Sequence, residues 1–480
     1  MSYIPSSNDL LAISPMVILC GLALVSLVIQ FLLPKKDDYF LLWGLALIAL
    51  LGALFALYYS TSSPGYGKYF SSQISLSPLT VWLSAIYLIS GLFTILVAPK
   101  FLEEKGILFP EFFPLLLFCI SGMMFLTTGY DLIVIFVGLE ILSLSLYVLI
   151  GMTRTSVQAL ESSMKYFLLG AFSSGFMLLG IAFLFGGSGS TNLDIALRGL
   201  FQKGYESNYT KLGFGLFLIG VSFKTALVPF HSWTPDVYEG SETSLTGFMA
   251  SAGKVSAMGL LMVLFTHIPA GVLGETWKYL MGGLALISMT WGNIIALKQD
   301  NLKRMLAYSS ISHAGYVTAG IACGANLEAL YYLFIYAILN LAVFALISYL
   351  ETSKIHITVS GISNLSQEFP LASIALSILF LSFAGFPPFI GFWTKLFLLQ
   401  KIAESDDLFQ RILLFGAVAN SCVAFYYYMK ITIQSYMKTE PTELLKGEKI
   451  HSNPGLFLLI GLLCLFFTFG WIFFQPGSLL

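Results

Sequence analysis

Fourteen stretches of about twenty mostly apolar residues recur along the chain, and this recurrence limits the possible folds more than any other feature. A helix needs about 20 such residues to cross the hydrocarbon core of a bilayer. Hydrophobic residues make up 57% of the 480 residues and charged residues only 10%, against about a quarter in soluble domains. We therefore predict an all-α polytopic membrane protein. Its expected spans are 10–33, 39–60, 76–98, 113–129, 131–151, 159–187, 209–230, 244–267, 275–297, 302–322, 328–350, 371–400, 409–436 and 455–474.

The distribution of Lys and Arg predicts the orientation of these spans. Loops after odd-numbered spans, to which charged residues near a span end such as Lys303 are assigned, hold more Lys and Arg than loops after even-numbered spans. Cytoplasmic loops carry such an excess. We therefore expect the odd-numbered loops in the cytoplasm and both termini outside. The basic residues form no stripe that would suit a nucleic acid.

Four basic residues cannot be assigned to any loop, namely Lys165, Lys224, Lys254 and Lys395. With the carboxylate Glu140 they are the candidate functional residues. A charge at the centre of a membrane helix costs about 2.5–3.5 kcal/mol. Glu140 lies about 14 Å into its span at the rise of an α-helix, and Lys254 lies at a similar depth. Two alternatives stay open. Lys165 lies nearer the start of its span and could snorkel to the interface, and the other charges could form ion pairs that are purely structural.

Two of the spans are interrupted by proline close to a lysine. Pro229 follows Lys224, and Pro387 and Pro388 precede Lys395. Unwound backbone in a membrane is tolerated only where protein or a water-filled cavity satisfies it. The interrupted spans are the seventh and the twelfth, and a shift of five spans reverses direction across the membrane. We therefore predict two inverted five-helix repeats, and divide the chain into segments 1–112, 113–270, 271–437 and 438–480.

A buried lysine beside a carboxylate suggests a way to move protons. If Glu140 moves toward or away from Lys224, that lysine is loaded with a proton or releases it. Lys224 precedes its break and Lys395 follows its own, so we expect the first half to open to the cytoplasm and the second to the outer face. His313 suits either a relay on a hydrated path or a packed core position. His231 either lies at the cytoplasmic mouth or caps carbonyls freed by the break.

No motif for a redox or nucleotide cofactor is present in the sequence. The five cysteines are far apart and show no C-x-x-C spacing, and no dinucleotide or P-loop fingerprint follows a strand signal. No two histidines have the spacing of a helical zinc pair. We expect this chain to bind no cofactor and no metal, so the energy for transport would come from chemistry elsewhere.

Five longer motifs give the chain a family resemblance: GLEILSLSLYVLIG (138–151), KYFLLGAFSSG (165–175), FKTALVPFHSWTPDVYEGSETSLTGFMASAGKV (223–255), NLKRMLAYSSISHAGY (301–316) and AGFPPFIGFWTK (384–395). Together they resemble subunit N of the bacterial proton-pumping NADH–quinone oxidoreductase, respiratory complex I. The resemblance extends from the first span to the last. It implies fourteen membrane helices in two inverted repeats, and a proton path through Glu140, Lys224, Lys254 and Lys395 with Lys165 modulating the first pair.

The resemblance also implies the setting of the chain. The expected partners are the antiporter-like M subunit and small membrane subunits in a bacterial inner membrane, and NADH, FMN, iron–sulfur clusters and quinone are expected in partner subunits. Two other functions stay open. A stand-alone cation/proton antiporter or a membrane-hydrogenase subunit would use the same lysines without this redox partner, and a structural spacer would need no protonation at all.

Overall fold

The computed structural model describes residues 4–32, 39–107, 109–200, 207–266, 275–404, 407–437 and 454–479. Within these ranges the regular structure is helical apart from one short hairpin, so the all-α prediction is confirmed. Eleven predicted spans are each filled by one helix: α1 (Ser7–Leu32), α2 (Tyr39–Ser62), α3 (Pro78–Glu104), α4 (Phe112–Thr128), α5 (Leu132–Ile150), α6 (Val157–Ser188), α12 (Glu275–Ala296), α13 (Leu302–Ala322), α14 (Asn326–Thr352), α18 (Leu408–Tyr436) and α19 (Pro454–Phe469).

Two of the other three spans contain broken helices, and the third contains a helix with a π-helical segment. The seventh holds α8 (Asn208–Thr225), which stops before the proline, and α9 (Trp233–Gly240) follows beyond the span. The twelfth holds α16 (Pro370–Ala384) and α17 (Ile390–Ala403). Both predicted proline breaks are therefore confirmed. The eighth span holds α10 (Thr243–Phe248) and α11 (Lys254–Thr266), joined by the π-helical segment Met249–Gly253, which was not predicted.

Smaller elements complete the description. A two-stranded antiparallel hairpin, β1 (Gly67–Tyr69) and β2 (Ile74–Leu76), was also not predicted. The short helices are α7 (Leu193–Leu197), α15 (Leu365–Glu368) and the 3-10 turns Arg198–Leu200, Gly470–Ile472 and Pro476–Leu479. Of the predicted segment boundaries, those near 270 and 438 fall in 267–274 and 438–453, outside the described residues.

Polar caps fix where several of the long helices begin. The Asp131 carboxylate accepts a hydrogen bond from the Ile133 N–H at the start of α5, and the Ser156 hydroxyl accepts one from Ala159 at the start of α6. Asn301 accepts from the N–H groups of Lys303 and Arg304 at the start of α13. Such caps satisfy N–H groups that have no partner within the helix, so they set the ends of spans whose apolar sequences alone would leave them undefined.

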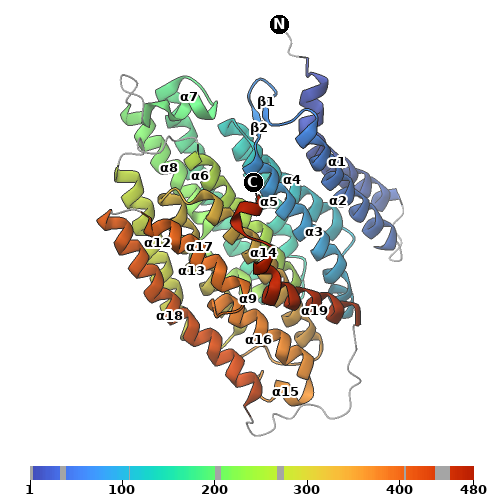
Figure 1. Cartoon of the computed structure of the whole chain (residues 1–480). Coiled ribbons are helices and arrows are strands. Elements are labelled where there is room, and N and C mark those ends of the chain that lie inside the picture. The colour runs from blue at the N-terminus through green and yellow to red at the C-terminus, as the bar shows by residue number, and fades with distance from the viewer. Residues whose placement is uncertain are drawn as a thin grey trace. The chain divides into compact units, whose positions relative to one another are not determined.

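The chain forms two compact units. The first comprises Met1–Leu96, Ile107–Thr225 and Ala252–Thr276, and the second comprises Val97–Gly106, Ala226–Ser251 and Trp277–Leu480. In the first unit α1 lies beside α2 (Figure 1), and α6 packs closely on α8. A Cβ on Gly180 would lie 2.5 Å from the Phe217 nitrogen, and one on Gly213 would lie 2.7 Å from the Leu184 nitrogen. Glycine is therefore what lets these two helices approach, as in other membrane-helix pairs.

In the second unit α16 runs along α18 (Figure 1), while α9 packs on α13 and α10 on α14. The helices α13 and α14 are almost entirely buried.

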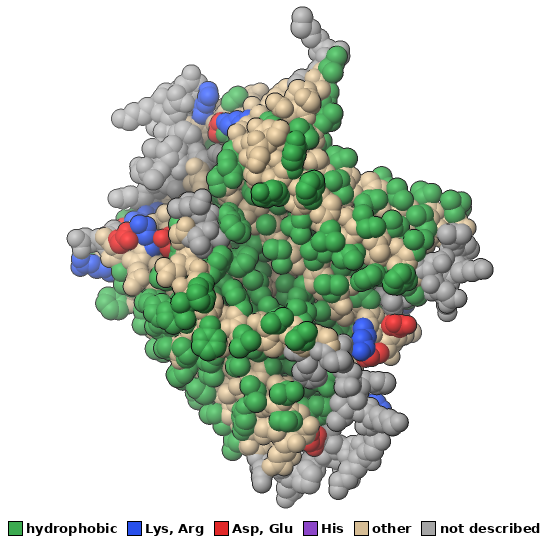
Figure 2. Space-filling view, turned by 45° about the vertical axis from the view of Figure 1, so that its right-hand side comes forward, with side chains coloured by type: hydrophobic (Ala, Val, Ile, Leu, Met, Phe, Trp, Pro, Cys, Tyr) green, Lys and Arg blue, Asp and Glu red, His purple; other side chains and the backbone are tan. Residues whose placement is uncertain are grey.

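Figure 2 shows hydrophobic side chains over most of the face drawn, with charged side chains gathered in a few patches. Large apolar side chains such as Leu24, Phe55 and Phe415 are exposed along their helices. Large apolar side chains exposed along helices are the pattern of a protein that lies in lipid.

Candidate functional site

Lys224 lies in the last turn of α8 and is buried. Its Nζ donates to the Tyr147 hydroxyl at 3.3 Å. The same atom lies 4.8 Å from the centre of the Tyr166 ring and 5.3 Å from that of Tyr147. Aromatic faces stabilise a cation in a dry site. The ammonium group therefore sits in an aromatic pocket built from α5 and α6.

Glu140, the predicted partner of Lys224, lies on α5 but makes no salt bridge within 4.0 Å to any residue that the structure describes. Its Oε1 is buried and has no hydrogen-bond partner among the described residues. Glu140 acts electrostatically on both Lys224 and Tyr147. Tyr147, two turns along α5 from Glu140, makes the direct contact instead. Tyr147 was not among the predicted site residues, although its spacing of seven from Glu140 places both on one helix face.

Lys165 lies on α6 with its side chain 44% exposed, and its Nζ is 2.7 Å from the Glu161 carboxylate one turn earlier. The next residue, Tyr166, is the one that faces Lys224. Since successive helical residues point about 100° apart, Lys165 is directed away from that pocket. Its predicted influence on Lys224 and Glu140 remains a prediction.

Lys254 is the first residue of α11 and is 5% exposed. Its Nζ donates to the Thr225 carbonyl at 2.7 Å. Thr225 ends α8, and Ala226 follows it in the left-handed region at φ 55°. In a continuous helix this carbonyl would accept from the N–H four residues later, which is position 229, a proline without an N–H. The lysine supplies the donor that Pro229 lacks.

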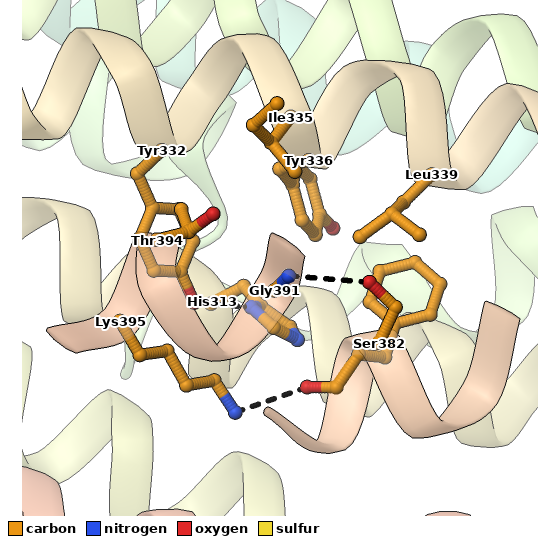
Figure 3. A pocket seen from close by; sticks show the side chains of 10 residues that line it. His313, Tyr332, Ile335, Tyr336, Leu339, Ser382, Gly391, Thr394 and Lys395 are labelled. Carbon is orange, nitrogen blue, oxygen red and sulfur yellow. Dashed lines mark hydrogen bonds between the residues drawn. The ribbon is translucent and has the colours of Figure 1, made fainter. Parts of the chain in front are cut away.

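Lys395 likewise supplies hydrogen-bond donors to free carbonyls at the second break. Its Nζ donates to the carbonyls of Phe383 and Ala384, both at 3.0 Å, at the end of α16; Figure 3 shows this ammonium directed at the helix end. Those two carbonyls would bond to positions 387 and 388, both prolines. A cation at a helix C-terminus is also favoured by the helix dipole.

Gly385 makes room for this arrangement. It caps α16 with φ 79° in the left-handed region, where glycine carries no steric penalty. A Cβ there would lie 3.0 Å from Lys395 Cδ and 3.3 Å from its Nζ. In the sequence, Lys224 and Lys395 are alike because each lies near a proline break. By contact, Lys254 is the counterpart of Lys395, since each donates to the free carbonyls of a broken helix.

His313, in the middle of α13, is held by two tyrosines. Its Nδ1 is 2.6 Å from the Tyr332 hydroxyl and its Nε2 is 3.2 Å from the Tyr428 hydroxyl. His313 and Lys395 line one small cavity with Tyr332, Ile335, Tyr336, Leu339, Ser382, Phe383, Gly391 and Thr394 (Figure 3). The cavity leaves about 10 Å³ for the centre of a water-sized molecule, which is about the least that one water needs.

Tyr336 gives this cavity a polar wall. Its side chain is buried, and its hydroxyl makes no hydrogen bond of good geometry among the described residues, although the Ser310 and Asn340 side chains lie close enough to interact with it. The choice between a relay and a packed core position for His313 stays open. His231, in the turn before α9, lies with its ring 6.3 Å from that of Trp291, and its two alternatives both stay open.

One residue lies elsewhere than expected. Lys303 was assigned to a loop, but it belongs to α13 and is buried. The α13 helix starts one residue before Lys303, and α9 packs over that end, so the charge is covered by protein. In the part of the chain that the structure describes, no three His, Cys, Asp or Glu side chains gather as metal ligands.

Comparison with known proteins places this geometry in a family. A model described as the NADH:quinone oxidoreductase/Mrp antiporter membrane region matches residues 129–420. The chain is 74% identical over 480 residues, the full length of both proteins, to NADH-quinone oxidoreductase subunit N of Leptospira biflexa serovar Patoc. Subunit N of Leptospira interrogans is 47% identical over 479 residues, which is all of this chain and 94% of that one. The chain belongs to the NADH-quinone oxidoreductase subunit N family.

A solved structure agrees with the membership of this chain in the subunit N family. A chain of respiratory complex I from Thermus thermophilus with bound aureothin superposes with a TM-score of 0.78 at 28% identity, covering 95% of this chain and 97% of that one. The predicted family and the antiporter-like helical fold are therefore confirmed. The chain is a multi-pass membrane subunit of a respiratory enzyme complex.

Proposed function

We propose that this chain carries protons across the membrane through Glu140, Lys224, Lys254, His313 and Lys395, as a subunit of NADH-quinone oxidoreductase. The observation that carries the proposal is the placement of the lysines at the two breaks. Lys254 and Lys395 are buried, and each ammonium is held by backbone carbonyls rather than by a carboxylate. A charge held only by dipoles can be given up without leaving an uncompensated counter-charge in the interior.

In the first unit, Glu140 and Lys224 form the loading element. The carboxylate acts on Lys224 without a direct salt bridge, so a small movement of α5 changes the stabilisation of the protonated lysine. The Tyr147 hydroxyl touches Lys224 and keeps the ammonium in place during such a movement. Lys254 is the next carrier, and Lys165 modulates the first pair.

In the second unit, His313 and Lys395 are the carriers. They share a cavity of about the size of one water molecule, and both imidazole nitrogens of His313 lie within hydrogen-bond distance of tyrosine hydroxyls. A water hydrogen-bonded to Tyr336 would connect the two carriers. The first half opens to the cytoplasm, and the second half opens to the outer face.

The chain itself performs no redox chemistry in this proposal. NADH, FMN, iron–sulfur clusters and quinone are bound by partner subunits, and the antiporter-like M subunit and small membrane subunits are the neighbours. The protein lies in the bacterial inner membrane with both termini outside. A stand-alone cation/proton antiporter with the same lysines is the alternative, and the subunits that copurify in mild detergent separate the two.

The test is a double-mutant cycle on the loading element. Glu140→Gln removes the negative charge but keeps the shape, and Lys224→Ala removes the carrier. We expect each to depress quinone-linked NADH oxidation and proton translocation in membranes, while oxidation by an artificial acceptor at the flavin persists. The double variant should be no worse than the more severe single variant, because both disable one element.

Lys211→Ala is the matched control, since Lys211 is an exposed lysine on the same helix as Lys224. It should leave translocation unchanged. Wild-type translocation in either single variant would remove this pair from the mechanism, and strictly additive losses would show that the two residues act separately.

A further inference from the structure

Four charged side chains from four separate segments of the second unit meet at one place. Lys105 follows α3, Glu242 caps α10, Lys303 lies in the first turn of α13 and Glu351 lies at the end of α14. We call this group the corner cluster. Its residues follow the third, seventh, ninth and eleventh predicted spans, whose ends must share one side of the membrane. It contains two cations and two carboxylates, so it is balanced in charge.

Glu351 makes the most contacts in the corner cluster. Its Oε2 accepts from Lys105 Nζ at 2.8 Å and from the Thr243 hydroxyl at 2.8 Å, and its Oε1 lies 3.9 Å from Lys303 Nζ. Lys105 also bonds to Glu242 at 3.2 Å. The Glu351 side chain is only 21% exposed and that of Glu242 only 5%. Charge pairs with so little solvent are stronger than surface pairs, and breaking one leaves a costly unpaired charge.

The target of these contacts is the turn between α9 and α10. Lys303 Nζ donates to the Ser241 carbonyl at 2.9 Å and contacts the Thr243 hydroxyl at 3.3 Å. The Glu242 carboxylate accepts from the N–H groups of Ser244 and Leu245. Residues 241–243, which are the two turn residues and the first residue of α10, are therefore all held by the corner cluster.

A second set of charges holds the helix that precedes the turn. Arg304 Nη1 lies 2.8 Å from the Asp236 carboxylate and 2.7 Å from that of Glu239, and both acids lie on α9. Thus α13 contributes Lys303 to the turn and Arg304 to α9. These two neighbours in sequence both act on the segment that follows the first helix break.

For Lys105, a role in holding the turn explains the contacts better than a proton relay does. Burial alone would lower the pKa of Lys105, but the Glu242 and Glu351 carboxylates outweigh it and raise that pKa above its usual range. A group that holds its proton more tightly is a poor carrier and a good ion-pair partner. The contacts also join four segments rather than leading from solvent toward His313.

We propose that Glu351 is a positioning residue for proton translocation: through the corner cluster it fixes the turn at 241–243, from which α10 and the π-helical segment lead directly to Lys254. Ten residues, 244–253, lie between Thr243 and Lys254, and all of them are helical. The turn and the carrier lysine are therefore joined by helical residues without a gap. This inference rests on the proposed function, because it assumes that the position of Lys254 matters for transport.

The test uses Glu351→Gln in the assembled complex, in native membranes. Glutamine keeps the size of the side chain and can still accept from Thr243, but it removes the charge that holds Lys105 and Lys303. We expect the number of protons moved per NADH oxidised to fall at least twofold, while NADH oxidation by an artificial acceptor stays unchanged. Glu368→Gln is the matched control, since Glu368 is an exposed glutamate in the same unit, and its ratio should equal that of the wild type.

A second variant, Lys105→Gln, removes one partner from the more exposed edge of the corner cluster. We expect it to lower the same ratio, and the double variant to be no worse than the more severe single variant. If Glu351→Gln prevents assembly, Lys105→Gln provides the test. A lowered number of protons moved per NADH oxidised in the assembled complex supports the positioning role of the corner cluster, and a wild-type number overturns it. Reduced assembly with a wild-type ratio per assembled complex also overturns it, because the role would then be purely structural.

These outcomes separate the inference from the proposed function. A wild-type ratio in both corner-cluster variants, together with lost translocation in Lys224→Ala, rejects the positioning role of the corner cluster and leaves the proposed proton path intact. Wild-type translocation in Glu140→Gln and Lys224→Ala removes the proton path itself.

Discussion

Substituting Lys395 separates its two roles, since it is both a proton carrier and the donor to two backbone carbonyls. Lys395→Met removes the ammonium and leaves the carbonyls of Phe383 and Ala384 without their donor. Each buried acceptor without a partner costs about 1–3 kcal/mol, so we expect the end of α16 to be destabilised by about 2–6 kcal/mol. Lys395→Met should therefore abolish translocation and also lower the thermal stability of the complex.

Lys395→Arg provides the comparison, because a guanidinium group has several donors for the same carbonyls but stays protonated in proteins. We expect this variant to keep most of the stability that Lys395→Met loses, and still to fail in translocation. The assays are the thermal stability of the purified complex and the protons moved per NADH oxidised in membranes. Wild-type translocation in Lys395→Arg would refute the reasoning, since it would show that this residue need not release a proton. Equal stability of Lys395→Met and wild type would refute the capping argument.

The contacts support two further predictions. Lys254→Met frees one carbonyl, that of Thr225, so thermal unfolding of the complex should show a loss of about 1–3 kcal/mol, roughly half that of Lys395→Met, together with lost translocation. Lys278 bonds to Asp407 and lowers the pKa of that carboxyl. This pair therefore stabilises the fold fully above about pH 3.9, the ordinary pKa of the carboxyl. The stabilisation is lost as the pH falls through the lowered pKa of Asp407. In thermal unfolding from about pH 3 to about pH 7, Asp407→Asn should remove this part of the acid dependence, and an unchanged pH profile would contradict it.

Much of the fold could be predicted because a lipid environment allows the backbone few structures. A helix must satisfy its own backbone in the membrane, so each run of about twenty apolar residues had to be helical, and the structure places a helix in every predicted span. The hairpin at 67–76 gave no such signal, because each strand has only three residues. The π-helical segment gave none either, since its sequence, MASAG, is also suited to an ordinary helix.

The burial of the candidate lysines could be predicted from the sequence, but their contacts could not. A lysine within an apolar run indicates burial, and Lys224, Lys254 and Lys395 are indeed buried. Which carbonyl each lysine meets depends on packing between helices far apart in the chain, as with Lys254 and Thr225. Lys303 was misplaced because a charge near a helix start usually reaches water, and only the fold reveals the turn that covers it.

The prolines at the two breaks tie proton occupancy to the order of the backbone. Each one removes an N–H, and a lysine proton takes the vacant place at Thr225 or at Phe383 and Ala384. Protonation of the lysine and ordering of the helix end are therefore coupled equilibria, and the coupling is reciprocal. The free energy by which a protonated lysine orders the helix end equals the free energy by which an ordered helix end favours the protonated lysine. Strain transmitted to the backbone from a distant subunit would therefore change the proton affinity of the lysine without any direct contact with the lysine.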